Sequence, residues 1–288
     1  MEIQKYEINK NDSLELKDIF ECGQCFRWNK QNNGKYIGIF KNNVLEVYEE
    51  NNKIIFEGIC DRNIKEIVED YFDLKRDYNK IKEKLSCIDE SMKNSIEYGK
   101  GIRILNQDLW ETIISFIISA NNNIPRIKGI IERLSEKYGR KIEYKDNVYY
   151  TFPTAEELKD VSVEEYRKLG LGFRDIRLYE TTHRILNKEV DLESLKNNKN
   201  TLEVREELLK LSGVGPKVAD CILLFSELKR LEVFPIDVWV RRVMNELYIK
   251  NPDETKVSKK QIEKIAKEKF GDLAGIAQQY LFYWRRDS

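Results

Sequence analysis

The sequence predicts an α+β protein, in which an antiparallel β-sheet domain at residues 1–97 precedes a mostly helical domain at residues 98–288. Two observations favour this division. Short runs of β-branched and aromatic residues separated by Asn-rich turns occupy the middle of the first part. From about residue 102 onward, apolar residues recur at helical spacing almost without interruption. Because no low-complexity segment separates the two parts, we expect the domains to pack together.

Three segments of the first domain are typical of antiparallel strands, namely residues 35–40, 44–48 and 53–57. The tripeptides between them, Lys-Asn-Asn and Glu-Asn-Asn, are turn signals, because Asn tolerates the backbone conformations that tight turns need. Residues 64–74 follow with apolar side chains on one face of a helical pattern, which predicts a helix.

The second domain is predicted to consist of helices. Residues 108–120 are apolar nearly all round, as expected of a buried central helix. Helical spacing, with Ser, Thr or Asp at several starts and Gly at two ends, predicts further helices. These span residues 124–138, 154–160, 163–169, 174–186, 202–211, 218–225, 237–247, 258–270 and 273–284.

Composition narrows the classes of function. The 288 residues include 50 Lys and Arg, 50 Asp and Glu, and one histidine, His183, so His-based catalytic triads and most His-built metal sites are disfavoured. The sequence has no apolar run near the ~20 residues of a membrane helix, and its first ten residues lack the apolar stretch of a signal peptide. Five unevenly spaced cysteines indicate reduced thiols. We therefore expect a cytoplasmic protein that does not contact membranes.

Residues 202–225 predict a helix-hairpin-helix. One helix ends at Leu211, and Gly213 and Gly215 permit the positive φ values that reverse a chain tightly. Pro216 suits the first turn of the next helix, whose free N–H groups can bind a phosphate. The spacing of a nucleotide-binding P-loop is absent, so this turn suits a nucleic-acid backbone better. A purely structural turn is the alternative.

Lys217 and Asp237 are the candidate catalytic pair. Lys217 lies in the first turn of a helix, where the macrodipole disfavours a cation, so a lowered pKa should make its free amine available for attack on carbon. Asp237 stands where an N-cap is expected, and capping alone would explain it. Brought together at two helix starts, the two side chains could serve as nucleophile and cation stabiliser.

Five ordered motifs resemble the helix-hairpin-helix DNA glycosylases, and specifically the 8-oxoguanine DNA glycosylase/lyase family, over nearly the whole chain. These motifs are Gly23-Gln24-Cys25-Phe26-Arg27-Trp28, Ser119-Ala120-Asn121-Asn122-Asn123-Ile124, Gly213-Val214-Gly215-Pro216-Lys217-Val218-Ala219-Asp220-Cys221, Pro235-Ile236-Asp237-Val238 and Ala277-Gln278-Gln279-Tyr280-Leu281-Phe282. The resemblance implies a TBP-like sheet domain followed by a helical domain of the HhH-GPD type. It also implies a bifunctional enzyme of base excision repair, a DNA N-glycosylase with abasic-site lyase activity.

The resemblance implies the chemistry of the catalytic pair. The 8-oxoguanine base would be flipped out of duplex DNA, which costs a few kcal/mol of stacking and pairing. Lys217 would attack C1′ as the base leaves, and the resulting Schiff base would permit β-elimination of the strand. Asp237 would stabilise the positive charge that develops on the sugar. Gly213, Val214 and Gly215 would contact the DNA backbone.

A second set of residues would read the lesion, again by resemblance. Cys221 and Phe282 would sandwich the base, and the spacing of Lys217 and Cys221 puts both on one helix face. The backbone carbonyl of Gly23 would accept a hydrogen bond from the N7–H that only the oxidised base carries, while Gln278 would read its Watson–Crick edge. Without the resemblance, Phe282 would be assigned to the core and Gln278 to the surface.

A third set would act on the strand opposite the lesion. Asn121 would fill the vacated space, and Arg126 and Arg174 would hydrogen-bond the orphaned cytosine. Phe173 stands where family members often carry Tyr, so its ring would wedge the stack without a hydroxyl that could help select the opposite base. Trp239 stands where many members have His.

No metal or cofactor is expected. No cysteine follows Cys221, whereas the related endonucleases hold an iron–sulfur cluster with four closely spaced C-terminal cysteines. Cys22 and Cys25 lack a second ligand pair for zinc.

The expected partner is double-stranded DNA containing 8-oxoguanine, bound by a monomer. Two alternatives remain open. A glycosylase for alkylated bases usually lacks the hairpin lysine, and a non-catalytic helix-hairpin-helix DNA-binding protein would need neither Lys217 nor Asp237.

Overall fold

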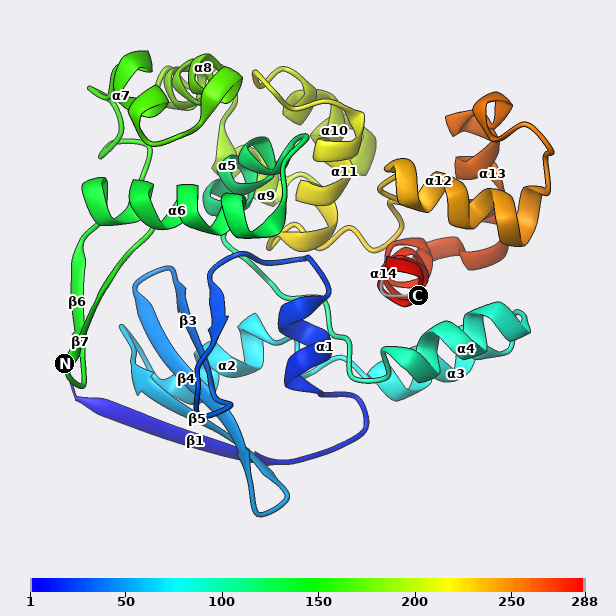
Figure 1. The fold of residues 1–288 in the computed structure, drawn as a ribbon, viewed down its shortest axis with the longest axis horizontal. Coiled ribbons are helices and arrows are strands. Elements are labelled where there is room, and N and C mark those ends of the chain that lie inside the picture. The colour runs from blue at the N-terminus through cyan, green and yellow to red at the C-terminus, as the bar shows by residue number, and fades with distance from the viewer. Residues whose placement is uncertain (1, 287–288) are drawn as a thin grey trace.

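Five antiparallel strands form the sheet of the first part in the computed structural model, which describes residues 2–286 (Figure 1). In the spatial order β1-β5-β4-β3-β2, they are Ile3–Asn9, Lys53–Ile59, Asn43–Glu50, Tyr36–Phe40 and Trp28–Lys30. The strands predicted at 35–40, 44–48 and 53–57 are confirmed as β3, β4 and β5. The edge strands β1 and β2 were not predicted, because a half-exposed edge strand and a three-residue strand carry little apolar patterning.

Two helices, α1 (Leu16–Glu21) and α2 (Ile64–Tyr71), contribute apolar side chains to the core on one face of the sheet. Phe20 and Trp28 stack there with ring centroids 4.1 Å apart. A small cluster on sheet residues such as Val44 packs with Tyr144 of a β-hairpin, formed by β6 (Lys141–Tyr144) and β7 (Asn147–Tyr150). This hairpin extends from the helical part to the sheet (Figure 1). The prediction of almost uninterrupted helix after residue 102 is therefore wrong at this point.

Helices make up most of the remaining chain. They are α3 (Tyr78–Ser86), α4 (Glu90–Tyr98), α5 (Leu109–Ser119), α6 (Ile124–Tyr138), α7 (Val163–Lys168), α8 (Asp175–Leu186), α9 (Leu192–Asn197), α10 (Thr201–Leu209), α11 (Pro216–Phe225), α12 (Val238–Met244), α13 (Lys259–Phe270) and α14 (Ala274–Arg286). Shorter helical turns span Gly172–Arg174, Asn245–Ile249, Glu254–Lys256 and Gly271–Leu273. The predicted central helix is confirmed as α5, which is buried along nearly its whole length.

The helix predicted at residues 154–160 is wrong, because this segment forms only turns. Its backbone hydrogen bonds are local. For example, the Leu158 N–H donates to the carbonyls of Thr154 (3.2 Å) and Ala155 (3.1 Å). A helix that began in this segment could not extend far, because α7 begins directly after Ser162 with a complete capping box.

The chain passes between the two cores more than once. Tyr78, Leu85 and Met92 of α3 and α4 pack in the core of the helical part, and α4 lies along α14 (Figure 1). In contrast, Leu105 packs in the core of the sheet. The single boundary at residues 97/98 therefore stays a prediction. Within residues 2–286, none of the helices combines the length and apolar character that a membrane crossing requires.

Candidate active site

The helix-hairpin-helix forms as predicted between α10 and α11, but its two glycines have different conformations. Gly213 adopts φ +84°, and an added Cβ there would lie 2.8 Å from Cδ of Arg177. Gly215 caps α11 with φ −88°, so the prediction of a positive φ at Gly215 is wrong. A Cβ at Gly215 would meet nothing within 4 Å. The turn thus leaves open space in front of the first N–H groups of α11.

Six predicted residues from four segments of the chain line one small cavity. These are Gly23, Lys217, Cys221, Asp237, Gln278 and Phe282, joined by Phe116, Phe225, Pro235 and Gln279. They come from the loop after α1, the start of α11 and α12, and α14, and α12 packs beside α14 (Figure 1). The cavity holds about 50 Å³. That is room for only one or two water molecules, so a base enters only if side chains such as the partly buried Phe282 move.

Lys217 is surrounded by groups that favour its protonated form. Its Nζ lies 5.5 Å from the centroid of the Phe116 ring. The charge of the Cys221 sulfur raises the pKa of Lys217, and the Asp237 carboxylate adds to this, while burial opposes it. The predicted lowering of the Lys217 pKa is therefore wrong, because the effect of these neighbours outweighs that of burial. Burial also raises the pKa of the Cys221 thiol. Near neutral pH the amine is therefore an ammonium, which must lose a proton before it can attack carbon.

Asp237 caps α12, as predicted. Its Oδ1 accepts a hydrogen bond from the Val240 N–H at 2.8 Å. The cap bond uses Oδ1 and holds the side chain at the cavity wall.

Gln278 is buried in the cavity wall, so the alternative that places it at the surface is wrong. Its side chain is 5% exposed, and its Oε1 has no hydrogen-bond partner among the described residues. An unsatisfied buried acceptor costs about 1–3 kcal/mol. Such an atom is expected where a ligand supplies the missing donor.

Gln279 is a cavity residue to which the sequence analysis assigned no role. It is 2% exposed, and its Nε2 donates to the main-chain oxygen of Cys22 at 2.7 Å. Nothing in the residue pattern distinguishes it from Gln278, because both lie in one motif. Its contact is visible only in three dimensions.

The four residues predicted to act opposite the lesion also lie together. Asn121 is exposed with φ +51°, and its main-chain oxygen accepts from Nη2 of Arg174 at 2.7 Å. Phe173 is 53% exposed, and its ring centroid lies 4.2 Å from Cζ of Arg174. Burial, and then the charges of Arg126 and Arg177, lower the pKa of Arg174. An exposed aromatic ring therefore stands within a cluster of guanidinium groups.

Arg174 is buried, which the sequence did not predict. It is 1% exposed and donates to the main-chain oxygens of Ala120, Asn121 and Leu171. Arg126 is exposed and makes one bond to the Gly170 carbonyl at 3.2 Å. The two arginines therefore differ in how freely they can turn toward DNA.

Within residues 2–286, no cluster of three or more His, Cys, Asp or Glu side chains could hold a metal ion. Cys22 and Cys25 are free thiols, of which Cys22 is buried in the core of the helical part and Cys25 in the core of the sheet. The expectation that the protein needs no cofactor stays a prediction.

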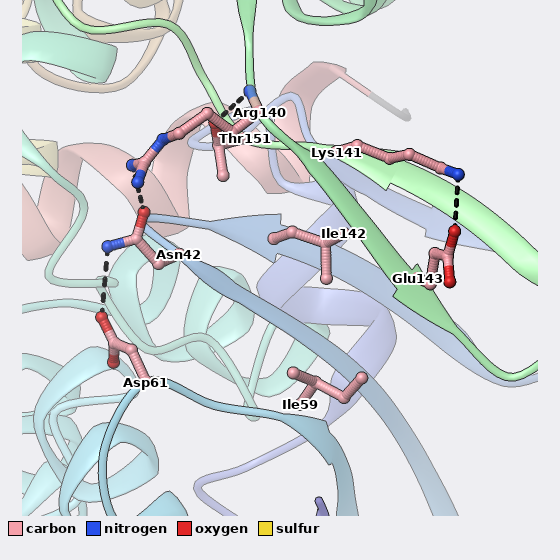
Figure 2. Close-up of a pocket in the computed structure, with 8 residues that line it drawn as sticks. All are labelled: Asn42, Ile59, Asp61, Arg140, Lys141, Ile142, Glu143 and Thr151. Atoms are coloured by element: carbon pink, nitrogen blue, oxygen red, sulfur yellow. Dashed lines mark hydrogen bonds and ion pairs between the residues drawn. The ribbon is translucent and has the colours of Figure 1, made fainter. Parts of the chain in front are cut away.

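A larger cavity of about 670 Å³ lies between the β6–β7 hairpin and the sheet, and Figure 2 shows its lining. Arg140 donates to Oδ1 of Asn42 at 2.7 Å, and Nδ2 of Asn42 donates to Asp61 at 3.3 Å. Since these polar groups pair with one another and no predicted site residue lines this cavity, the smaller cavity is the stronger candidate.

The chain is similar to known proteins over nearly its whole length. Residues 5–113 match the family of the 8-oxoguanine DNA glycosylase N-terminal domain, and residues 114–271 match the HhH-GPD superfamily of base excision DNA repair proteins. The chain is 32% identical to a probable N-glycosylase/DNA lyase of Methanothermobacter thermautotrophicus, over 81% of this chain and 78% of the relative. It is 33% identical to the N-glycosylase/DNA lyase of Saccharomyces cerevisiae, over 85% and 70% of the two chains. The crystal structure of Clostridium acetobutylicum 8-oxoguanine glycosylase/lyase, in complex with double-stranded DNA containing cytosine opposite 8-oxoguanine, superposes with a TM-score of 0.91 at 46% identity, covering 100% of this chain and 98% of that one.

Proposed function

Because the chain belongs to the 8-oxoguanine DNA glycosylases of the HhH-GPD superfamily, we propose that its small cavity excises 8-oxoguanine from duplex DNA and that Lys217 then cleaves the strand. One observation supports the assignment of this function to particular residues. Lys217, Asp237 and Gln278, whose buried Oε1 is an unpaired acceptor, line the same cavity. A nucleophile, a carboxylate and a base-reading group therefore converge at one place.

Lys217 is the proposed nucleophile. Its deprotonated amine forms a bond to C1′ of the flipped nucleotide as the bond from C1′ to the base breaks and the electron pair leaves with the base. The nitrogen then passes one proton to the departing base, and the sugar ring opens as O4′ takes up a proton, which gives a protonated Schiff base. Removal of a C2′ proton then expels the 3′ phosphate. Asp237 stabilises the cationic sugar, and its cap bond to Val240 keeps the carboxylate in place.

Two acceptors bind the flipped base in this proposal, and only the Gly23 carbonyl distinguishes the oxidised base from guanine. Gln278 Oε1 accepts from the N–H groups on the Watson–Crick edge, and the Gly23 carbonyl accepts from N7–H. Undamaged guanine has an acceptor at N7, so binding it would leave the Gly23 carbonyl unpaired at a cost of about 1–3 kcal/mol. Phe282 and Cys221 cover the two faces of the base once the cavity opens.

The cluster formed by Asn121, Arg126, Phe173 and Arg174 acts on the opposite strand. Phe173 wedges between base pairs, and Asn121 enters the space that the flipped nucleotide leaves. Arg126, which is exposed, hydrogen-bonds the orphaned cytosine. Arg174 has four of its five N–H donors bound to main-chain oxygens, so it contributes mainly by holding Asn121.

The hairpin turn binds a phosphate of double-stranded DNA in this proposal. The Val214 N–H already donates to the Leu211 carbonyl at 3.1 Å. The N–H groups of Gly213 and Gly215, together with the first N–H groups of α11, are therefore the donors for an anion, and the open space at Gly215 lets a phosphate approach the backbone.

The organisation of the enzyme is proposed separately. We expect a domain boundary at residues 97/98, action as a cytoplasmic monomer and catalysis without a cofactor. Light scattering with and without duplex DNA would test the monomer, and activity after exhaustive chelation would test the absence of a cofactor.

Borohydride trapping tests the function directly. A duplex with one 8-oxoguanine, paired in turn with each of the four bases, should give a covalent adduct that disappears in Lys217→Gln. The four yields would rank the opposite bases. Adduct formation on an abasic site alone would keep the lyase and refute the 8-oxoguanine assignment. No adduct on either substrate, with salt-dependent duplex binding retained, would indicate a binding protein without catalysis.

A further inference from the structure

The peptide of Gly23 lies between two main-chain carbonyls that are each held by a glutamine side chain. Gln279 Nε2 donates to the Cys22 oxygen at 2.7 Å, and Gln107 Nε2 donates to the Gln24 oxygen, also at 2.7 Å. Gly23 itself has φ +87°, a conformation that L side chains rarely adopt. A glycine is conformationally permissive, so the direction of its carbonyl depends on what holds the neighbouring peptides.

The two glutamines fasten this loop to different parts of the protein. Gln107 also donates to the Phe225 oxygen at 3.0 Å, at the end of α11. Gln279 belongs to α14, which also carries Gln278 and Phe282. The bond from Gln279 therefore connects the loop to the helix that bears the other base-contacting side chains.

The hydrogen bond from Gln279 can fix the position of the Gly23 loop relative to α14. Its side chain is 2% exposed, so water does not compete for the Cys22 oxygen. A flipped purine is rigid, and a hydrogen bond weakens steeply outside a donor–acceptor range of about 2.7–3.2 Å. Two acceptors on different edges of one base must therefore keep a fixed separation.

We propose that Gln279 is a positioning residue for lesion recognition, which sets the Gly23 carbonyl at the distance from Gln278 that an oxidised purine requires. This inference rests on the proposed function, because it presumes that Gly23 and Gln278 contact the base. Gln279 touches neither the sugar nor Lys217 in this role. Strand cleavage at a preformed abasic site, where no base is read, does not depend on it.

The test compares Gln279→Met with a matched control. Methionine keeps the length and burial of the side chain but removes the donor. Thr182→Val removes a different buried bond, from Oγ1 to the Leu178 oxygen at 2.8 Å on α8. Single-turnover excision of 8-oxoguanine, β-elimination at an abasic site and thermal stability would be measured for both variants. In the Lys217→Gln background, the ratio of the Kd for an undamaged duplex to the Kd for an 8-oxoguanine duplex gives the discrimination.

For Gln279→Met we expect the discrimination and the excision rate to fall about tenfold, which corresponds to about 1.4 kcal/mol. Abasic-site cleavage should stay close to wild type, and Thr182→Val should keep both activities. Equal losses on the two substrates, or unchanged discrimination, would overturn the positioning role. If wild-type protein cleaved abasic sites but did not discriminate 8-oxoguanine from guanine, the proposed function would fall and this inference with it.

Discussion

The buried guanidinium of Arg174 holds the main chain of Asn121, with Nη2 2.7 Å from the Asn121 oxygen. Its Nε donates to the Ala120 oxygen at 3.0 Å, and Ala120 is the C-cap of α5. Carbonyls at a helix C-terminus lack intrahelical donors and carry partial negative charge, so a cation is stabilising there. Arg174 thus fixes a loop in which a non-glycine residue adopts a left-handed φ of +51°.

Replacing Arg174 should therefore affect folding as well as recognition. Arg174→Met removes the bonds to the end of α5 and leaves partly buried carbonyls without these donors, which should lower the melting temperature by roughly 5 °C. Arg126→Met, at an exposed arginine of the same cluster, should leave the melting temperature unchanged. Both variants should reduce the preference for cytosine in trapping assays. Thermal melts of the two variants separate the roles, and an equal loss of stability in both would contradict this assignment.

Replacement of Gln278 should lower activity without lowering thermal stability. Gln278→Met removes the unpaired buried Oε1 while keeping the volume of the side chain, so thermal stability should rise or stay constant. Excision of 8-oxoguanine should fall at least about tenfold if one base contact is lost. Binding to an undamaged duplex should change little. A parallel loss of both, measured by fluorescence anisotropy, would refute the base-reading role.

The fold class and the cavity residues could be predicted because local patterns and ordered motifs carry them. The glycine turn before α11 and the cap at Asp237 are examples, since each depends on residues close in sequence. The β6–β7 hairpin was missed because its strands have four residues each and meet the sheet only in the folded chain.

The environment of individual side chains could not be predicted in the same way. The raised pKa of Lys217 depends on Cys221 and Asp237, and only the folded structure sets how strongly they act on it. Likewise, the contact from Gln279 to Cys22 joins residues 257 positions apart. Such long-range relationships leave no local signal in one sequence.

The two hairpin glycines should respond differently to alanine. Gly213→Ala introduces a Cβ 2.8 Å from Arg177 Cδ at φ +84°, so it should destabilise the protein by at least about 1 kcal/mol. Gly215→Ala places its Cβ in open space at an ordinary φ, and should keep or slightly raise stability.

If a phosphate approaches the backbone at Gly215, Gly215→Ala should nonetheless weaken duplex binding. Urea unfolding and anisotropy titrations at two salt concentrations would measure both properties. Unchanged DNA affinity in Gly215→Ala would place the phosphate elsewhere.

The pKa of Lys217 should respond to removal of the Cys221 sulfur. That sulfur is the largest contribution that raises the Lys217 pKa, and a serine hydroxyl of similar size does not ionise in this range. In Cys221→Ser, the pH at half-maximal trapping on a preformed abasic site should therefore move to lower values. An abasic substrate is used because the base-stacking role of Cys221 does not enter. A shift to higher pH, or none, would show that Cys221 does not control the amine.

Glu111 on α5 should make the stability depend on pH. Burial raises its pKa from 4.5 to about 7, with Arg27 opposing and the charges of Asp108 and Glu132 adding to the rise. The folded chain therefore binds this proton more tightly than the unfolded chain does. The stabilisation is fully present below pH 4.5 and is lost as the pH rises through about 7.

Glu111→Gln keeps the shape of the protonated acid and removes the titration. Its stability should match wild type near pH 5 and exceed it at pH 8 by about 1–3 kcal/mol, since one pKa unit corresponds to about 1.4 kcal/mol. Urea unfolding at several pH values between 5 and 8 would measure the difference. Glu136→Gln, at an exposed carboxylate on α6, serves as control and should show no such trend. If the difference between Glu111→Gln and wild type stayed constant across this range, the carboxyl of Glu111 would not be the group that titrates.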